Sequence, residues 1–332
     1  MKLSAKKVVV TGGAGFIGSH LVDALAESHD VVVLDDLSSG KVENLSQALA
    51  TGRVTVHLWD LRQGEDLADV LEGAGLVFHL ATQCLRLSIS SDSSLVHEVN
   101  TTGTLNLLKA CRKADIDRFI YVSSSEVYGT AKTVPMSEEH PLDPTTIYGA
   151  SKLTGEIYTR VYNQMYALPA VIVRPFNTYG PRSHFEGYSG EVIPKFAVRI
   201  FGGKPPVIFG SGRQTRDFTY VSDVVHGILL AARNLATGKV VNIACGHEVS
   251  VQEVADSVIH RAEAYSLKPV YTAQRPGDVL RHFADIRLAR NELGFSPQIS
   301  FQKGLALYTD WFRQEFAEKI DECMAAEVER NW

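Results

Sequence analysis

The most informative stretch of the sequence is rich in glycine and lies near the start of the chain. It reads Val8-Val9-Val10-Thr11-Gly12-Gly13-Ala14-Gly15-Phe16-Ile17-Gly18. Its three valines predict a buried strand, and residues 15–28 predict a helix. Glycines 12, 15 and 18 stand between the two with the spacing GxxGxxG. Residues without a Cβ let the backbone approach a pyrophosphate, which then binds the N–H groups of the helix N-terminus. The stretch therefore predicts a phosphate-binding loop.

An acidic residue, Asp35, ends the second predicted strand (31–35) and lies 17 residues after Gly18. A carboxylate there accepts hydrogen bonds from both ribose hydroxyls of NAD and repels the 2′-phosphate of NADP. We therefore predict NAD as the cofactor. Asp60 and Leu61 follow the third predicted strand and either flank the adenine or form a turn without a ligand.

Short β-branched runs alternate with amphipathic stretches through the first half of the chain. The predicted strands are nearly continuous apolar runs, which are typical of a parallel sheet covered on both faces. The alternation predicts an α/β, Rossmann-type doubly wound parallel sheet. Further strands are predicted at 54–59, 76–80, 118–123 and 170–174, and helices at 95–113 and 150–166.

The composition changes after Asn177, where residues 178–212 are rich in Gly and Pro. Such residues mark loops and short elements, and a strand at 240–244 and helices at 251–264 and 301–330 are predicted beyond them. We expect residues 1–176, with a contribution from about 214–245, to form an NAD-binding Rossmann domain. Residues 177–332 are expected to form mainly a smaller C-terminal substrate-binding domain.

Composition excludes several other classes of protein. The 332 residues carry a net charge of −5, which argues against a nucleic-acid partner. The four cysteines form no CxxC pair and the histidines show no metal-binding spacing, so neither a metal site nor a disulfide framework is expected. No apolar run reaches the length of a signal peptide or membrane span. We expect a soluble, cytoplasmic protein.

A second motif, Tyr148-Gly149-Ala150-Ser151-Lys152, carries chemistry. Tyr148 and Lys152 are four residues apart on one helix face, where the ammonium lowers the phenol pKa from about 10. The phenolate then takes a proton from an alcohol while hydride leaves the same carbon for nicotinamide. The serines 123–125 end a predicted strand, where open α/β sheets bind ligands, and one of them can bond the same oxygen.

Five segments together resemble the extended short-chain dehydrogenase/reductase family, specifically its nucleotide-sugar epimerases and dehydratases. The segments occur in the order typical of the family and span residues 6 to about 311. They are TGGAGFIGSH (11–20), DVVVLDD (30–36), YVSSSEVYG (121–129), YGASK (148–152) and VRPFNTYGPR (173–182).

The resemblance implies a role for each matching residue. On the catalytic and cofactor side, the implied residues are Ser124, Tyr148 and Lys152 for catalysis, Gly12, Gly15, Phe16, Ile17 and Gly18 for the pyrophosphate, Asp35 for the adenosine ribose, and Leu80, Ala81 and Asn100 along the cofactor. On the substrate side, the implied residues are Asn177 for the sugar diphosphate, Arg216 and Arg275 for the phosphates, and Asp278 near the nucleoside. The resemblance also implies a homodimer formed through the helices at 95–113 and 150–166.

The reaction within the family stays open between three outcomes. All begin with oxidation of the hexose at C4 to a ketone. Glu126 resembles the acid that dehydratases and decarboxylases place near C5 and C6, but Ser125 stands where many dehydratases carry an Asp. The stretch 275–285 is more similar to the sugar 4-epimerases.

We therefore expect an NDP-sugar 4-epimerase acting on a nucleotide-diphosphate sugar, with UDP-sugars favoured. The alternatives are a 4,6-dehydratase and a UDP-glucuronate-type decarboxylase. A non-catalytic NAD-binding sensor is a remote alternative, because the catalytic residues are intact.

Three further side chains have two interpretations each. Arg182 either approaches the C5 substituent, which favours a carboxylate-bearing sugar, or is a loop arginine. His184 and His282 either face the sugar or lie elsewhere.

Overall fold

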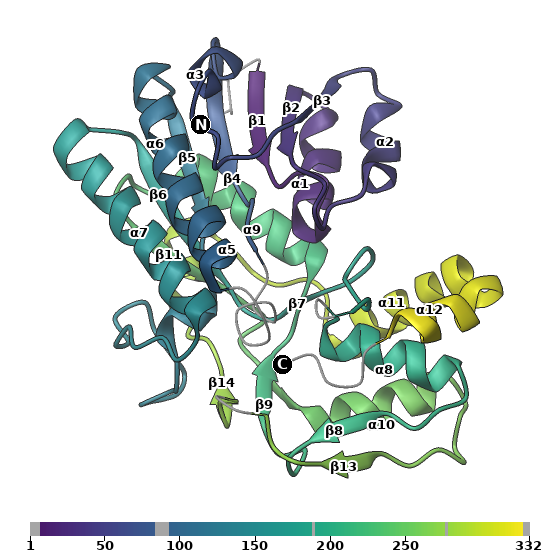
Figure 1. Ribbon diagram of the computed structural model, residues 1–332. Helices are drawn as coiled ribbons and strands as arrows, with labels where there is room; N and C mark the ends of the chain where they lie inside the picture. Colours follow the sequence, from purple (N-terminus) through teal and green to yellow (C-terminus); the bar gives the residue numbers. More distant parts are fainter. Residues whose placement is uncertain (1–6, 84–92, 188–189, 276–277, 328–332) are drawn as a thin grey trace.

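A computed structural model describes residues 7–83, 93–187, 190–275 and 278–327 (Figure 1). Seven strands form one sheet in the order β11-β6-β5-β4-β1-β2-β3, and every neighbouring pair is parallel. This confirms the predicted doubly wound Rossmann-type sheet. The strands are β1 (Lys7–Thr11), β2 (Asp30–Asp35), β3 (Val54–Leu58), β4 (Ala74–His79), β5 (Arg118–Val122), β6 (Ala170–Pro175) and β11 (Val240–Ile243).

Helices cover both faces of this sheet (Figure 1). Val8 and Val10 of β1 pack into the core shared with α1 (Phe16–Ala26) and α9 (Val221–Asn234), whereas Val9 packs into the core shared with α6 (Thr104–Lys113). The long helix α7 (Ile147–Tyr166) lies on the α6 side. Both faces of the sheet are therefore buried, which is why the strand sequences are continuous apolar runs. Shorter elements on this half are η1 (Val42–Leu45), α2 (Ser46–Leu49), α3 (Leu67–Val70) and η3 (Ser125–Tyr128).

The helix predicted at 95–113 is interrupted. The structure has α5 (Ser93–His97), a π-helical turn η2 (Glu98–Gly103) and then α6. Within the wide turn, the Asn100 side chain accepts hydrogen bonds from the Gln83 N–H at 2.7 Å and the Thr82 hydroxyl at 3.0 Å. Its amide also donates to the Ser151 hydroxyl at 3.0 Å. The π-turn thus binds α7 and the loop after β4 together, a use that π-bulges often have near functional sites.

The second half of the chain adds short strands and helices below the sheet in Figure 1. Three small sheets, β12-β9-β14, β13-β8 and β10-β7, join its strands. The elements are β7 (Thr178–Tyr179), α8 (Val192–Phe201), β8 (Val207–Phe209), β9 (Thr215–Asp217), β10 (Thr219–Tyr220), β12 (Glu248–Ser250), α10 (Val251–Arg261), β13 (Val270–Thr272), β14 (Arg281–His282), η4 (Ala289–Leu293), α11 (Phe301–Phe316), η5 (Ala317–Lys319) and α12 (Ile320–Ala326).

The prediction of one continuous helix over 301–330 is wrong for residues 301–327, and residues 328–330 lie outside the described part of the chain. The chain leaves the α-helical path at η5, and α12 packs against α8 instead of continuing α11. Cys323 is buried there, and Met324 packs on the same core. The break lets apolar residues of α12 reach a helix more than a hundred positions earlier in the chain, a contact that periodicity does not reveal. No helix in the described part of the chain is both long and apolar enough to cross a membrane.

One buried carboxylate ties the small β12-β9-β14 sheet to the edge of the large one. Asp217 of β9 is fully buried and accepts hydrogen bonds from the N–H groups of Cys245 and Gly246 at 3.0 Å and of Ala284 at 3.3 Å. Burial raises the pKa of Asp217 to about 7. Cys245 follows β11, which is itself a strand of the large sheet, so residues within 214–245 form part of the Rossmann sheet. The domain boundary at 176/177 stays a prediction.

Candidate active site

A cavity of about 340 Å³ lies at the carboxyl ends of the parallel strands. Six strands of the large sheet send a loop or a last residue to its wall, which is where open α/β sheets bind ligands. The predicted site residues that line it are Gly12, Gly15, Phe16, Ile17, Gly18, Asp35, Asp60, Leu61, Leu80, Ala81, Ser124, Glu126, Tyr148, Lys152 and Asn177.

The glycine loop has the shape that a pyrophosphate requires. Gly12 has φ +67°, and a Cβ there would lie 2.6 Å from the Ala81 nitrogen. A Cβ on Gly18 would lie 2.0 Å from the Gly12 oxygen. Both positions therefore need glycine, because backbone occupies the space of a side chain. The tight turn leaves the N-terminus of α1 at the cavity wall, where its N–H groups and dipole suit an anion.

Asp35, at the end of β2, is held in place by backbone. Its two carboxylate oxygens accept hydrogen bonds from the N–H groups of Ala14 and Leu37, each at 2.9 Å. The residue is buried, and this burial raises the pKa of the carboxyl group. Each oxygen keeps a lone pair for a ribose hydroxyl, so the geometry fits the adenosine end of NAD.

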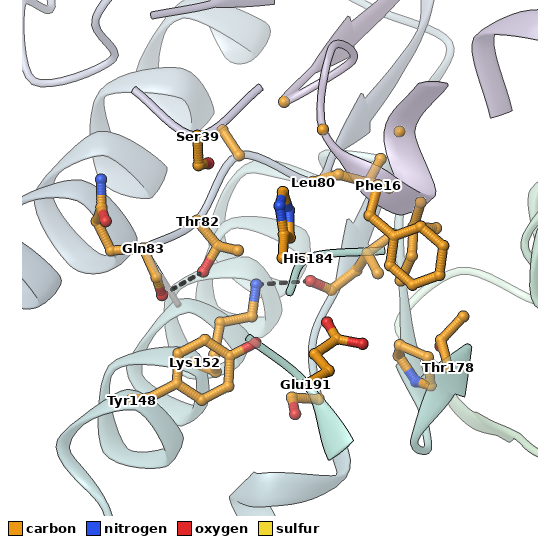
Figure 2. A pocket seen from close by; sticks show the side chains of 18 of the residues that line it. Phe16, Ser39, Leu80, Thr82, Gln83, Tyr148, Lys152, Thr178, His184 and Glu191 are labelled. Atoms are coloured by element: carbon orange, nitrogen blue, oxygen red, sulfur yellow. Dashed lines mark hydrogen bonds between the residues drawn. The ribbon is translucent and has the colours of Figure 1, made fainter. Parts of the chain in front are cut away.

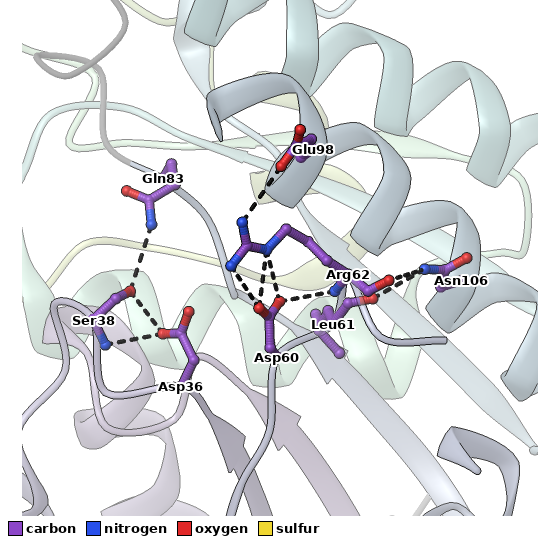
Figure 3. Close-up of polar contacts among 8 residues, drawn as sticks. All are labelled: Asp36, Ser38, Asp60, Leu61, Arg62, Gln83, Glu98 and Asn106. Carbon is purple, nitrogen blue, oxygen red and sulfur yellow. Dashed lines mark hydrogen bonds and ion pairs between the residues drawn. The ribbon is translucent and has the colours of Figure 1, made fainter. Parts of the chain in front are cut away.

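Further polar residues surround this end of the cavity (Figure 3), and among them Ser38, Gln83 and Arg62 were not predicted from the sequence. Ser38, after β2, donates to the Asp36 carboxylate at 2.6 Å and accepts from the Gln83 amide at 3.4 Å. Asp60 pairs with Arg62 at 2.6 Å, and these hydrogen bonds lower the pKa of Asp60. The loops after β2 and β4 meet only in the folded sheet, so no local motif marks these residues.

Lys152 is the most deeply buried of the three predicted catalytic residues (Figure 2). Its ammonium donates to the Val122 carbonyl at 2.7 Å and lies 4.7 Å from the centre of the Tyr121 ring. The residue is 2% exposed, and burial lowers its pKa to about 7. Tyr148, one helical turn earlier, is partly exposed and lines the cavity.

Ser124 and Tyr148 share the cavity wall because two backbone segments pack closely. A Cβ on Gly149 would lie 2.6 Å from the Glu126 carbonyl oxygen, so this glycine lets the start of α7 approach the turn after β5. The Ser124 hydroxyl oxygen accepts a hydrogen bond from the Glu126 N–H at 3.1 Å. Its own O–H remains a donor for a ligand oxygen.

Five predicted residues are not part of the described lining of this cavity. Asn100 lies behind it in η2, with the hydrogen bonds given above. Arg182 forms an ion pair with Asp23 of α1 at 2.7 Å. Arg216 pairs with Asp278, and the Arg275 guanidinium lies 5.6 Å from the centre of the Phe209 ring. The last three cluster around the small β12-β9-β14 sheet and β8.

The cavity wall near Asn177 contains two residues, Thr178 and Glu191, to which the sequence assigned no role. His184, a candidate from the sequence, lines the cavity as well, and the Asn177 Oδ1 is buried without a hydrogen-bond partner among the described residues. His184 therefore faces the cavity. His282 instead is buried outside the described lining, with its ring 5.2 Å from that of Phe176.

Comparisons with known proteins identify the family of this chain. The family model described as the NAD dependent epimerase/dehydratase family matches residues 8–244. The UDP-glucose 4-epimerase of Mycolicibacterium smegmatis is 36% identical over 313 residues, covering 93% of this chain and 99% of that protein. The dTDP-glucose 4,6-dehydratase of an Actinoplanes species is 32% identical over 317 residues, covering 92% and 98%.

A solved structure shows the same likeness in three dimensions. The UDP-glucose 4-epimerase of Thermotoga maritima with UDP-glucose superposes with a TM-score of 0.87 and 33% identity, covering 93% of this chain and 99% of that one. Sequence and fold therefore agree over nearly the whole chain. The glycine loop, Asp35 and the Ser–Tyr–Lys group stand on the wall of one cavity, and the chain belongs to the NAD-dependent epimerase/dehydratase family, with NAD as its cofactor.

Proposed function

We propose that this chain is an NDP-sugar 4-epimerase that acts on UDP-sugars. The observation that carries the proposal is that Ser124, Tyr148 and Lys152 line the same cavity as the glycine loop and Asp35. A sugar bound beside a nicotinamide in this cavity would meet all three side chains. The 4-epimerase named among the relatives, covered along almost its whole length, supports the same reaction.

The roles of the residues follow from their positions. Tyr148 takes the proton of the C4 hydroxyl and later returns it, and Ser124 donates its free O–H to the same oxygen. Lys152 stabilises the phenolate from the buried side of the helix. Bound NAD would supply the hydride acceptor and donor for C4. Inversion at C4 requires the 4-keto sugar to rotate within the cavity. The opposite face of the C4 carbonyl then lies toward the nicotinamide, and hydride returns to that face.

The nucleotide diphosphate would bind between the cavity and the small β12-β9-β14 sheet. Arg216 and Arg275 supply guanidinium groups there, which bond phosphate oxygens in a planar fork. The neighbouring Asp217 fixes the backbone at Arg216, because its carboxylate accepts hydrogen bonds from the N–H groups of Cys245 and Gly246 at the edge of the sheet. Asp278, which pairs with Arg216, would lie near the nucleoside.

A 4,6-dehydratase is the second candidate, and Glu126 is the observation that favours it. Its side chain lines the cavity next to Ser124, where it could take a proton from C5. Turnover of UDP-glucose and dTDP-glucose in D₂O separates the two reactions. A 4-epimerase moves hydride between C4 and the cofactor, so its product keeps the substrate mass and gains no carbon-bound deuterium.

A dehydratase product would be lighter by one water and deuterated at C5. We expect the first result, and we expect Glu126→Gln to remain active. Tyr148→Phe serves as the matched control, since it should form a product of either kind about 10²–10⁴ times more slowly at the same enzyme concentration. Loss of water together with deuterium at C5 would overturn the epimerase proposal and make Glu126 the base.

We further propose a homodimer formed through α6 and α7. Three apolar side chains of α7 with a spacing of four residues are exposed, namely Ile157 (50%), Val161 (36%) and Met165 (68%). Residues at this spacing form one stripe along a helix, and an exposed apolar stripe suits a protein interface. Ile157→Asp combined with Met165→Asp should convert a dimer to a monomer in light scattering, whereas Lys303→Asp, a charge change on the exposed surface of α11, should not.

The cellular location is also a proposal. Cys111, Cys245 and Cys323 are free thiols, and Cys111 and Cys323 are buried. Free thiols persist in a reducing compartment, which supports the cytoplasm.

A further inference from the structure

The charges at the sugar end of the cavity are unevenly distributed. Two carboxylates line it, Glu126 after β5 and Glu191 before α8. The cationic or titratable bases in the described lining are Lys152 and His184. Lys152 is almost fully buried and already donates to the Val122 carbonyl, so its charge serves the Tyr148 side of the site. The space for the sugar is therefore bordered mainly by negative groups.

Glu191 is held so that its side chain enters this space. It is the N-cap residue of α8, yet its side chain forms no capping hydrogen bond to that helix. Its N–H donates to the His184 carbonyl at 2.8 Å, and its own carbonyl accepts from the Lys195 N–H at 3.0 Å. The backbone is thus anchored on both sides, and Figure 2 shows the Glu191 carboxylate extending into the pocket across from Tyr148.

Two cations on neighbouring elements form ion pairs with carboxylates outside the cavity lining. Arg182 pairs with Asp23 at 2.7 Å, and both side chains are largely buried in that contact. Lys195, one turn after Glu191, lies 3.3 Å from Glu327. Among the described residues, no arginine lines the cavity. A carboxylate on the sugar would therefore meet Glu191 without the guanidinium that recognition of a carboxylate normally uses.

We propose that Glu191 is a specificity-determining residue that selects NDP-hexoses with neutral hydroxyl substituents and rejects uronates. This proposal rests on the proposed function and narrows its substrate class. A hydroxyl of a neutral hexose donates a hydrogen bond to the Glu191 carboxylate, whereas a uronate brings a second negative charge into the same space. Repulsion of the wrong ligand is a common source of specificity. The decarboxylase alternative, which needs a uronate, is disfavoured by the same residue.

The test compares the binding of two probes, UDP-glucose and UDP-glucuronate, to the NAD-loaded protein by calorimetry. We expect the unmodified protein to bind UDP-glucose at least about 30-fold more tightly, since juxtaposed like charges strongly disfavour a wrong partner. Glu191→Gln keeps the size of the side chain and removes its charge. It should reduce this ratio about tenfold, mainly by strengthening UDP-glucuronate binding.

Glu186→Gln is the matched control, because Glu186 pairs with Lys41 and lies outside the described lining. Its ratio should equal that of the unmodified protein. An unmodified protein that binds both probes equally, or a Glu191→Gln ratio that does not change, would overturn the proposal. Interconversion of UDP-glucose and UDP-galactose is measured on the same samples.

Selective binding without interconversion would refute the 4-epimerase while leaving the selectivity intact. Interconversion without selectivity would refute only the role of Glu191. Absence of binding to both probes would overturn both proposals.

Discussion

Replacing the buried Lys152 by methionine should make the protein more stable and nearly inactive. The side chain is 2% exposed and its ammonium donates a hydrogen bond to the Val122 carbonyl. Burial lowers its pKa from 10.5 to about 7, so the folded state disfavours the charge that the reaction needs. Methionine has a similar length and no charge, and it removes that cost together with the group that stabilises the Tyr148 phenolate.

The size of the effect follows from the two pKa values of Lys152. At about 1.36 kcal/mol per pKa unit, a fall from 10.5 to about 7 corresponds to about 5 kcal/mol of lost stability below pH 7. In the variant the Val122 carbonyl loses its hydrogen-bond donor, and this loss reduces the gain in stability by about 1–3 kcal/mol. Lys152→Met should therefore be more stable than the unmodified protein at pH 6 by about 2–4 kcal/mol.

The sign of the pH dependence is also determined. Between pH 7 and 10.5 the unfolded lysine is protonated and the folded one is neutral, so the unfolded state binds more protons and stability rises with pH. The free energy of unfolding of the unmodified protein relative to Lys152→Met should increase by about 2–3 kcal/mol from pH 6 to pH 9. All other groups contribute equally to both proteins and cancel in this difference.

Urea unfolding of the NAD-free proteins at pH 6, 7, 8 and 9 measures the difference. Lys109→Met, a change at an exposed lysine of α6, is the control and should show no such trend. A difference between the unmodified protein and Lys152→Met that stays flat, or that falls as pH rises, would refute the reasoning. Activity on UDP-glucose should be lost in Lys152→Met at every pH.

The other predictions concern the cofactor and the substrate. Tyr148→Phe should still bind NAD and nucleotide sugar but lose about 10²–10⁴ in turnover, and near-normal turnover would contradict its role. Asp35→Ala should narrow the preference for NAD over NADP in fluorescence titrations; tighter binding of NADP by the unmodified protein would disprove the role of the carboxylate. Arg216→Ala and Arg275→Ala should each raise the KM for UDP-sugar far more than the Kd for NAD, and an unchanged KM in both would show that neither binds phosphate.

The sequence alone determined the parts of this protein that depend on near neighbours in the chain. The strand–glycine–helix stretch at 8–18 specifies its own turn, because Gly12 and Gly18 are needed where backbone meets backbone. Asp35 is recognisable because it ends the next strand, beside that turn in a parallel sheet. Tyr148 and Lys152 lie on one helix face by their spacing alone. These residues all line the cavity.

The tertiary structure decided what depends on residues far apart in the chain. The π-turn at Asn100 exists where its side chain bonds Gln83 and Ser151, and no local pattern announces those partners. Arg182, a candidate for the sugar, is engaged by Asp23, 159 positions earlier. Glu191 enters the site because α8 begins at the cavity wall. Periodicity reports which face of an element is buried, but the partner across that face is chosen by packing in three dimensions.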